Sequence, residues 1–314
     1  MFQLRKKPAP PAEPTPPGPL PLSFAGVSKS FGFHRVLDAV DFAPPPGSVV
    51  GLLGANGAGK STLLKLLVGL LRADTGVVSV AGADSWDLPA AVKARIGYVD
   101  QRPRMYPWMK PKHLLPYFGS FYPRWDVGLL DRLAGEWAVP MNQAFGKLSP
   151  GQQQKVALLV AVGHHPDLLV LDEPVSALDP AARRAFLKSL LEMTADADGD
   201  GSTPTVLLST HITSDVERVA SHVAVLSDRR VGTFEELGDL KDRVKRLRIR
   251  SDGPLPEGFA VPGARTLTLD ADRRGAVAVV EGDPPPLPGL DAAVEGLNLE
   301  EIFLALTEGA RRDA

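Results

Sequence analysis

The sequence predicts an α/β fold in which a phosphate-binding loop joins a buried strand to a helix. A glycine-rich loop at residues 54–62 lies between the apolar run 49–53 and the helix-forming run 63–67. Residues 168–230 alternate between strand-like and helix-like patterns, which is typical of a parallel sheet. With 314 residues, 44% of them hydrophobic, the chain can bury one large domain or two modest ones.

The net charge and the absence of cysteine exclude several classes of function. The formal net charge is −2, so no overall basic field points to a nucleic acid, and no such partner is expected. The chain has no cysteine, which excludes disulfides, iron–sulfur clusters and thiolate zinc sites. A proline-rich segment follows the basic residues 5–7, and no run approaches the roughly 20 apolar residues of a membrane span. Neither a signal peptide nor a membrane helix is therefore expected.

The region before the loop divides into a tail and a set of strands. Eight prolines between Pro8 and Pro21 predict that residues 1–21 form a disordered, extended tail. A docking motif for a proline-binding partner stays open for this tail. Residues 22–50 alternate short apolar runs with turn residues, which predicts antiparallel strands, and glycines bound a further strand at 76–82.

The region after the loop contains helices and an acidic segment. Residues 103–165 are rich in aromatic residues and helix formers and are predicted to be mainly helical. The segment 196–201 begins like a calcium-binding EF-hand loop, but its twelfth position is Leu207 instead of the required glutamate. A solvated acidic loop is therefore favoured over a calcium site.

From about residue 243 the sequence pattern differs from that of the preceding region. Short strand patterns joined by Gly/Pro-rich connectors predict a small α+β accessory domain over residues 243–314. Its last segment has Asn298 followed three residues later by Glu301, a helix-capping pattern, and an amphipathic helix is expected after it.

The loop itself indicates nucleotide binding, with an ordinary glycine-rich turn as the alternative. Glycines at the first and sixth positions of G-x-x-x-x-G-K-[ST] let several backbone N–H groups point into one concavity at a helix N-terminus. Lys60 would reach the outer phosphates, and the Ser61 hydroxyl would bind Mg²⁺. The nucleotide-binding residues expected in this loop are Gly54, Ala55, Asn56, Gly57, Gly59, Lys60, Ser61 and Thr62.

Hydrolysis also needs a carboxylate for the metal and a group that orients water. Residues 168–171 form a short apolar run, which predicts a buried strand that ends in Asp172 and Glu173. Asp172 would support Mg²⁺, and Glu173 would polarise the attacking water. An Asp-Glu pair at a strand end is also compatible with simple solvation, so its meaning depends on the other motifs.

Four further segments resemble motifs of the ATP-binding cassette (ABC) family, in that family's order. Residues 148–152 (LSPGQ) resemble its LSGGQ signature, and residues 96–101 (IGYVDQ) resemble its Q-loop. Residues 176–179 (SALD) resemble the D-loop, and residues 209–211 (STH) the histidine switch. The resemblance implies a P-loop NTPase fold, an ABC ATPase domain over residues 22–240, with an antiparallel β subdomain and a helical subdomain at about 103–165.

The resemblance also implies the cofactors ATP and Mg²⁺ and an ATPase that works as a head-to-tail dimer, with two identical or two different cassettes. Gln101 would contact Mg²⁺ and the attacking water, and His211 would hold the γ-phosphate near Glu173. Phe31 would stack on adenine, with core packing or Phe33 in its place as alternatives. The residues that would reach the partner's ATP are Ser149, Gly151, Gln152 and Asp179.

Two positions depart from the family pattern. Pro150 replaces the first glycine of the signature and removes one N–H, but proline is tolerated in the first turn of a helix, where Ser149 is a natural N-cap. Altered turnover is therefore expected, not inactivity. Val160 replaces an arginine that often follows in the signature helix, which leaves any contact of that arginine in doubt.

The exporter branch of the family is the best match. Residues 106–108 (YPW), residues 121–126 (FYPRWD) and the ending 299–307 (LEEIFLALT) resemble the branch that handles drugs, antibiotics and lipids. The membrane permease would be a separate chain, with this subunit on the cytoplasmic face of the cell membrane. A soluble ABC ATPase of DNA repair or translation, the ATPase subunit of an importer and a nucleotide kinase are the alternatives.

Overall fold

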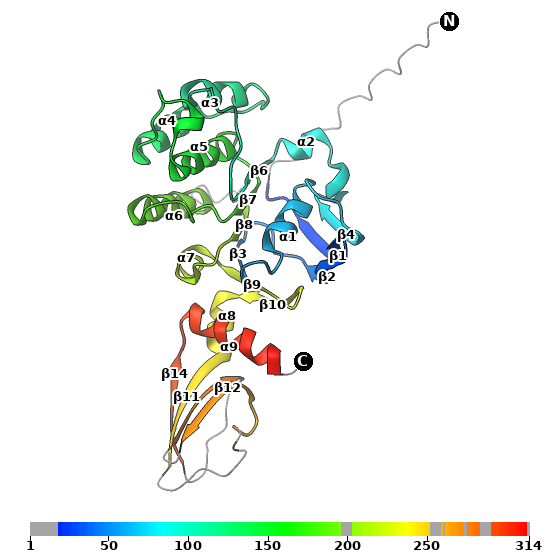
Figure 1. Cartoon of the computed structure of the whole chain (residues 1–314), viewed down its shortest axis with the longest axis vertical. Coiled ribbons are helices and arrows are strands. Elements are labelled where there is room, and N and C mark those ends of the chain that lie inside the picture. Colours follow the sequence, from blue (N-terminus) through cyan, green and yellow to red (C-terminus); the bar gives the residue numbers. More distant parts are fainter. Residues whose placement is uncertain are drawn as a thin grey trace, which may run out of the picture.

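A computed structural model of the chain describes residues 18–195, 203–251, 259, 261–272, 275–282 and 290–312. The described strands form three sheets, and Figure 1 shows the largest of them in the middle of the molecule. Helices α3, α4 and α5 lie at the upper left of that view, and the C-terminal strands extend below the central sheet. Within the described ranges, no helix combines the length and the apolarity that a membrane span requires.

The central sheet brings the ends of its parallel strands to one edge. Five strands are parallel and the sixth, β10, pairs antiparallel with β9. Every residue of β3, β7 and β8 is buried, because the sheet is covered on both faces, and this explains their continuous apolar runs. The sheet order is β10 (Arg230–Glu236), β9 (His222–Ser227), β3 (Val49–Leu53), β8 (Thr205–Ser209), β7 (Leu168–Asp172) and β6 (Ile96–Val99).

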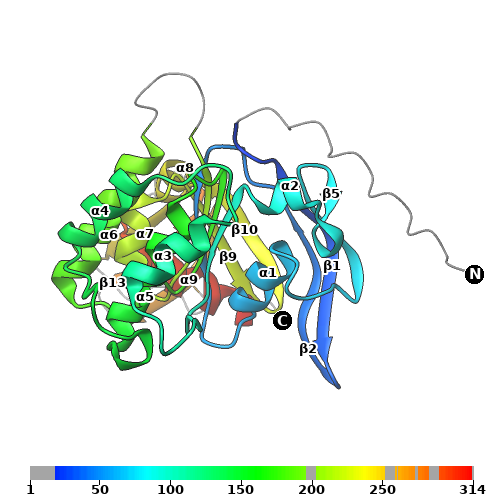
Figure 2. The same cartoon turned by 90° about the horizontal axis from the view of Figure 1, so that it is seen from above.

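Alternate residues of the central strands enter two separate cores. On β7, Leu168 and Val170 pack with α1 and the antiparallel strands, whereas Leu169 and Leu171 pack with the helical subdomain. Figure 2 shows this layering from above, with β1 and β2 on one side of the central sheet and α3 to α6 on the other. The helices that flank the sheet are α1 (Lys60–Leu67), α6 (Pro180–Thr194) and α7 (Thr213–Val219).

The antiparallel strands expected at 22–50 and 76–82 form one sheet, in the order β2-β1-β4-β5. Leu20, which the sequence places in the tail, is buried, and the Gly18 carbonyl accepts a hydrogen bond from Arg95 Nη2 at 2.7 Å. The proline-rich residues 1–17 lie outside the described residues. The elements of this region are β1 (Leu22–Phe31), β2 (His34–Phe42), β4 (Thr75–Val80), β5 (Ala83–Asp84), a 3₁₀ turn η1 (Ser85–Asp87) and α2 (Ala90–Lys93).

The region expected to be helical contains α3 (Pro111–Gly119), α4 (Val127–Glu136), the 3₁₀ turn η2 (Phe145–Lys147) and α5 (Pro150–Val162). Asp126 caps α4, since its Oδ1 accepts the Leu129 N–H at 2.8 Å. Just after α5, His164 is buried and its ring stacks on Tyr122, with the ring centroids 4.1 Å apart. Burial lowers the pKa of His164 to about 4.

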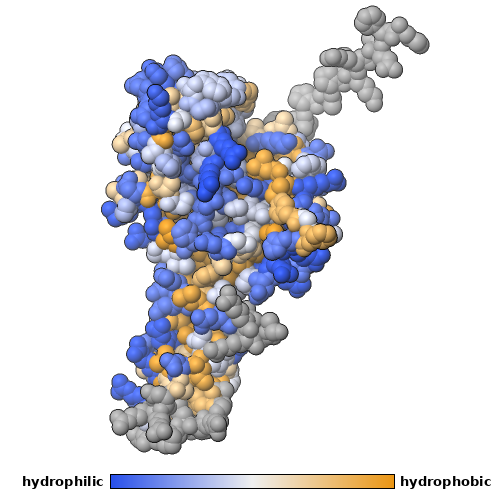
Figure 3. Space-filling model, in the orientation of Figure 1, coloured by the Kyte–Doolittle hydropathy of each residue, from blue (hydrophilic) through white to orange (hydrophobic). Residues whose placement is uncertain are grey.

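The C-terminal region is a four-stranded antiparallel sheet with two helices. The sequence predicts short strands and a last helix here, but not the strand at 291–296 or the helix at 237–243. The capping pair at its last helix is present: the Glu301 N–H donates to Asn298 Oδ1 at 2.9 Å, and the Asn298 N–H donates to Glu301 Oε2 at 3.0 Å. In the face shown in Figure 3, apolar side chains gather over this region more than over the helical subdomain. Its elements are α8 (Leu237–Arg243), β11 (Val244–Arg250), β12 (Arg265–Asp272), β13 (Gly275–Glu281), β14 (Asp291–Gly296) and α9 (Leu299–Arg312).

One core joins this C-terminal region to the central sheet. Leu53, the last residue of β3, packs in the same cluster as Val216 of α7 and Ile302 of α9. The boundary expected near residue 240 therefore lies within a continuous hydrophobic contact. The EF-hand-like segment 196–201 lies outside the described residues.

Candidate nucleotide-binding site

The predicted phosphate loop runs from the end of β3 to the first residue of α1. Gly59 has a φ of 110°, a conformation that side-chain-bearing residues rarely adopt. A Cβ on Gly54 would lie 2.7 Å from the carbonyl oxygen of Leu226, so the loop passes the neighbouring strand too closely for any other residue. These two glycines fix the backbone path that the sequence motif predicts.

Lys60 lies inside the loop with its side chain folded back onto it. Its Nζ donates hydrogen bonds to the carbonyls of Gly54 at 2.7 Å and Ala55 at 3.2 Å, and the residue is only 7% exposed. Burial lowers the pKa of Lys60, and the nearby carboxylates of Glu173 and Asp172 oppose that shift. The ammonium group is thus placed in a poorly solvated position where an anionic phosphate would interact with it strongly.

Asp172 lies directly behind the loop at the end of β7 and is fully buried. Its Oδ1 accepts hydrogen bonds from the hydroxyls of Ser61 at 2.9 Å and Ser209 at 2.7 Å. Its Oδ2 has no hydrogen-bond partner in the part of the chain that the structure describes. A buried carboxylate oxygen without a partner, beside a hydroxyl, fits the oxygen ligands that Mg²⁺ prefers.

Glu173 has an unusual backbone conformation for its residue type. Its φ is 49°, in the left-handed region that costs a non-glycine residue about 1–3 kcal/mol. The Glu173 N–H donates to the carbonyl of Ser209 at 3.1 Å and to its hydroxyl at 3.0 Å, which holds this conformation in place. Its Oε2 lies 2.8 Å from Nδ1 of His211, and the residue is nearly buried.

Lys60, Glu173 and His211 line one cleft of about 610 Å³, a size that suits a nucleotide, whereas Gly54, Ala55 and the buried Asp172 lie outside its described lining. Phe31 at the end of β1 contributes a ring that is 49% exposed, with Nζ of Lys29 5.6 Å from its centroid. Phe33 is exposed and is not part of the lining, so of the two rings Phe31 is the one available for stacking. The predicted residues that line the cleft are Phe31, Asn56, Gly57, Gly59, Lys60, Ser61, Thr62, Gln101, Glu173 and His211.

The signature residues lie elsewhere, at the start of α5. Ser149 is the N-cap: its hydroxyl accepts the Gln152 N–H at 3.3 Å, and Gln152 Oε1 accepts the Ser149 N–H at 2.9 Å. Pro150 occupies the first helical position, as expected. A Cβ on Gly151 would lie 2.5 Å from the carbonyl oxygen of Ala177, so a glycine is required there as well. None of these residues is among the described lining of the cleft.

Asp179 also lies outside the cleft and caps α6. Its Oδ1 accepts the N–H groups of Ala181 at 2.9 Å and Ala182 at 3.0 Å. The hydrogen bond from Ala182 is the main cause of a lowered pKa for this carboxyl. One half of the predicted ATP contacts is therefore assembled within the chain, and the other half lies at two separate helix starts, where Ser149 and Asp179 are exposed and Gly151 and Gln152 are partly buried.

Comparison with known proteins identifies the family. A model of the ABC transporter family matches residues 37–176, and a model described as an AAA domain, putative AbiEii toxin, matches residues 139–214. The chain is 32% identical over 311 residues to the Nod factor export ATP-binding protein I of Burkholderia lata, a match that covers 93% of this chain and 99% of that protein. The chain belongs to the ABC transporter ATP-binding family.

Two further similarities agree with this assignment. The daunorubicin resistance ATP-binding protein DrrA3 of Streptomyces coeruleorubidus is 31% identical over 315 residues, covering 91% of this chain and 96% of that protein. A solved ATP-binding subunit of an ABC transporter is 28% identical, with a TM-score of 0.63 over 71% of this chain and 92% of that chain. The predicted family and the ABC ATPase fold are confirmed, and as a family member the chain is an ATP-binding ATPase subunit of an ABC transporter.

Sequence reasoning missed three residues of the ABC site. His34 and Val36 of β2 line the cleft, although no motif in the sequence singles them out. Ser209 was noted only as a neighbour of His211, yet its hydroxyl joins Asp172 to the backbone of Glu173. The β7–β8 register, which pairs Asp172 with Ser209, is the signal that reveals this contact.

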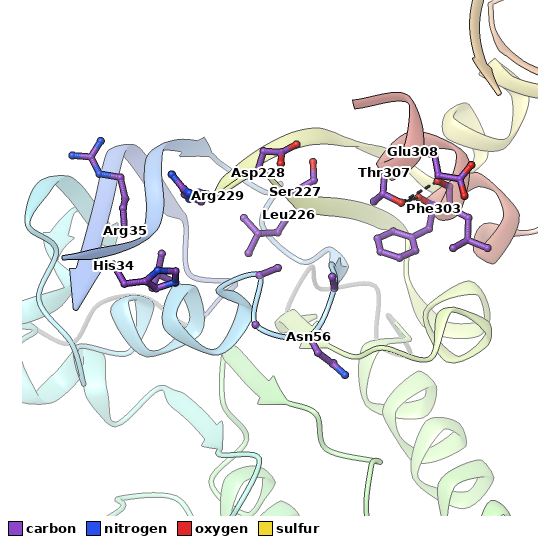
Figure 4. Close-up of a pocket in the computed structure, with 15 residues that line it drawn as sticks. His34, Arg35, Asn56, Leu226, Ser227, Asp228, Arg229, Phe303, Thr307 and Glu308 are labelled. Carbon is purple, nitrogen blue, oxygen red and sulfur yellow. Dashed lines mark hydrogen bonds between the residues drawn. The ribbon is translucent and has the colours of Figure 1, made fainter. Parts of the chain in front are cut away.

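A second cavity, of about 500 Å³, lies on the other side of the ABC phosphate loop (Figure 4). Asn56 lies at its edge and is shared with the nucleotide cleft, while Phe303, Thr307 and Glu308 of α9 form the opposite wall. The C-terminal helix is therefore a direct neighbour of the loop.

Proposed function

We propose that this chain hydrolyses ATP in sites shared between two head-to-tail cassettes, and so drives a separate membrane permease that exports its substrate. The observation that carries the proposal is the division of the ATP contacts. Lys60, Glu173 and His211 line one cleft, whereas the signature hydroxyl of Ser149 is exposed at the start of α5. A site built in this way needs a second subunit to close it.

Residues of the cleft have separate roles in this proposal. The loop N–H groups and Lys60 bind the phosphates, and Phe31 stacks on the base. Glu173 accepts a hydrogen bond from the attacking water and orients it toward the γ-phosphate. His211, whose Nδ1 lies 2.8 Å from Oε2 of Glu173, holds that carboxylate and contacts the γ-phosphate.

Mg²⁺ fits the same cleft. Ser61 and the buried carboxylate of Asp172 would hold it, with Gln101 nearby, and when bound it would neutralise charge on the phosphates. The ligands Ser61 and Asp172 already contact each other at 2.9 Å, so they need little rearrangement.

The second half of each site would come from the partner cassette. Ser149 and the N–H group of Gly151 would bind the γ-phosphate at the positive end of α5, with Gln152 and Asp179 beside them. Because the γ-phosphate would bridge two subunits, ATP favours a closed dimer and hydrolysis releases it.

An exposed aromatic patch supports docking to a permease. Tyr106, Trp108, Tyr117 and Phe121 gather on the helical subdomain, and adjacent ring centroids are 5.3–5.6 Å apart. Trp108 is 72% exposed and Phe121 63%, which is unusual unless a partner covers them. The names of two relatives, Nod factor export and daunorubicin resistance, support the export part of the proposal. We place the subunit on the cytoplasmic face of the membrane, bound to the permease.

Co-purification tests the proposal. A Glu173→Gln variant of the full chain, extracted from native membranes with ATP, should bring down a multi-span membrane protein. Adding Trp108→Ala should reduce that recovery severalfold, because it removes part of the patch. Trp86→Ala is the matched control, since Trp86 is 49% exposed outside the patch. Recovery of ribosomes or DNA in place of a membrane protein would contradict the proposal.

A further inference from the structure

Asp100 lies directly before Gln101, and its carboxylate accepts hydrogen bonds from two sides. Its Oδ1 accepts the backbone N–H of Arg102 at 3.1 Å, a contact from residue i+2 that closes an Asx turn around Gln101. Its Oδ2 accepts the Tyr98 hydroxyl at 3.0 Å and lies 3.2 Å from Nζ of Lys65. One side chain thus holds the backbone directly after Gln101 and also contacts the side chains of Tyr98 and Lys65.

Lys65 connects this turn to the phosphate loop. It lies on α1, one turn after Ser61, so the ion pair joins the helix that follows the loop to the end of β6. Gln101 lines the nucleotide cleft and also a polar cavity bounded by Lys65, Asp100 and Arg104. Gln101 is therefore a residue common to the two cavities.

Because the Lys65–Asp100 ion pair is partly exposed, it can affect the position of Gln101 without contributing much to the stability of the fold. The side chains of Lys65 and Asp100 are 33% and 35% exposed, and ion pairs of this kind contribute little to stability. Orientation of a group at a reacting centre depends much more steeply on small displacements, because a misplaced group loses its alignment with the bond that changes. A weak contact beside Gln101 can therefore matter for turnover without mattering for folding.

We propose that Asp100 and Lys65 are positioning residues that fix Gln101 relative to the phosphate loop. This inference rests on the proposed function, in which Gln101 lies beside the bound Mg²⁺, and on the family resemblance, which implies that Gln101 also contacts the attacking water. Asp100 supplies the turn, and Lys65 ties the turn to α1. Movement of Gln101 on its own, without α1, is thereby restricted.

The test compares steady-state ATP hydrolysis by full-chain variants over a range of Mg²⁺ concentrations. Asp100→Ala should lower kcat about tenfold with KM for ATP changed less than about twofold, and should raise the Mg²⁺ concentration for half-maximal rate severalfold. Asp100→Asn, which keeps the turn acceptor but loses the charge, should match Lys65→Met, with a loss of about threefold. The double variant Asp100→Ala/Lys65→Met should be no slower than Asp100→Ala, because both act through Gln101.

Controls distinguish the possible failures. Lys241→Met removes an ion pair to Glu217 of similar exposure, 35% and 26%, between α8 and α7, and should leave kcat unchanged. The melting temperatures of Asp100→Ala and Lys65→Met should stay within about 2 °C of the parent chain. If Asp100→Ala hydrolyses ATP as fast as Lys241→Met while Glu173→Gln is inactive, the positioning proposal alone is overturned. It is also overturned if Asp100→Ala loses kcat and melting temperature together. Full activity of Glu173→Gln would overturn the proposed function itself.

Discussion

The nucleotide cleft and the start of α5 carry the two sets of predicted ATP contacts, and the chain organises them differently. In the cleft, Asp172 and Glu173 are buried and tied to Ser209 by hydrogen bonds within the subunit. At the start of α5, Ser149 is exposed, and its hydroxyl bonds only within its own helix cap in the described structure. The cleft is thus organised before ATP binds, whereas the signature surface offers donors to something outside the chain.

This difference predicts that substitutions in the cleft and at the signature have separable effects. The cleft should set ATP binding and the chemical step. The signature should affect hydrolysis while leaving ATP binding to the isolated chain intact.

Glu173→Gln should give the largest loss, about a thousandfold in kcat, because a neutral amide polarises the attacking water far less than a carboxylate does. ATP affinity should be retained, since Lys60 and the loop glycines are unchanged. Hydrolysis and equilibrium binding of a fluorescent ATP analogue measure both quantities. A variant that loses binding together with hydrolysis would contradict the assignment of Glu173 to the chemical step.

Gly151→Ala should lower ATP hydrolysis about a hundredfold and leave ATP binding within about twofold. Its Cβ would meet the Ala177 carbonyl oxygen at 2.5 Å, so the start of α5 must shift away from the partner's phosphate. Gly135→Ala in α4 is the matched control, because nothing lies within 4 Å of its added Cβ. If Gly151→Ala weakened ATP binding as much as hydrolysis, the two surfaces would not be separable.

The burial of His164, just after α5, predicts that the fold loses stability in acid. Its pKa is about 4 in the folded chain against 6.5 for an unperturbed histidine, so between these values the unfolded chain binds more protons. The free energy of unfolding is therefore highest above about pH 6.5. It falls as the pH is lowered, by about 2 kcal/mol at about pH 5. Urea unfolding at pH 7.5 and pH 5 measures it. His164→Phe should lose less stability over this interval, and an identical loss in both chains would contradict the burial argument.

Pro150→Gly should have the smallest effect. It restores one N–H at the start of α5, and one added hydrogen bond to the partner's phosphate would raise kcat about two- to fivefold. The gain should appear only in hydrolysis by the dimer, not in ATP binding by the isolated chain. A lower kcat would indicate that the proline is needed to begin the helix.

The sequence predicted the parts of the site that depend on local pattern. Lys60, Asp172 and Glu173 follow from a loop motif and from a strand that ends in two acids. The contact of Ser209 with both acids depends on the register of β7 against β8, which short patterns do not contain. The Asx turn of Asp100 is local, but its link to Lys65 depends on how α1 packs on the central sheet, where it contacts β7, the strand next to β6.

In the fold, too, elements with a clear local pattern were predictable, whereas those that depend on long-range pairing were not. The buried strands β3, β7 and β8 were predictable because their apolar runs are continuous. The edge strand β14 was missed, since its residues Asp291–Gly296 are mostly exposed and lack an alternating pattern. That strand forms because β11 offers a free edge with matching register, from Lys245 opposite Gly296 to Arg250 opposite Asp291.

Site-directed cross-linking between subunits tests the central claim most directly, and the cysteine-free chain makes it clean. In a Glu173→Gln background, Ala55→Cys at the exposed loop is mixed with Lys147→Cys beside the signature and treated with a short bismaleimide. A shared site predicts a cross-linked dimer that forms with ATP, needs both variants and disappears with ADP. A cross-link within one chain carrying both cysteines, or no ATP-dependent cross-link when the permease is present, would contradict a site built from two subunits.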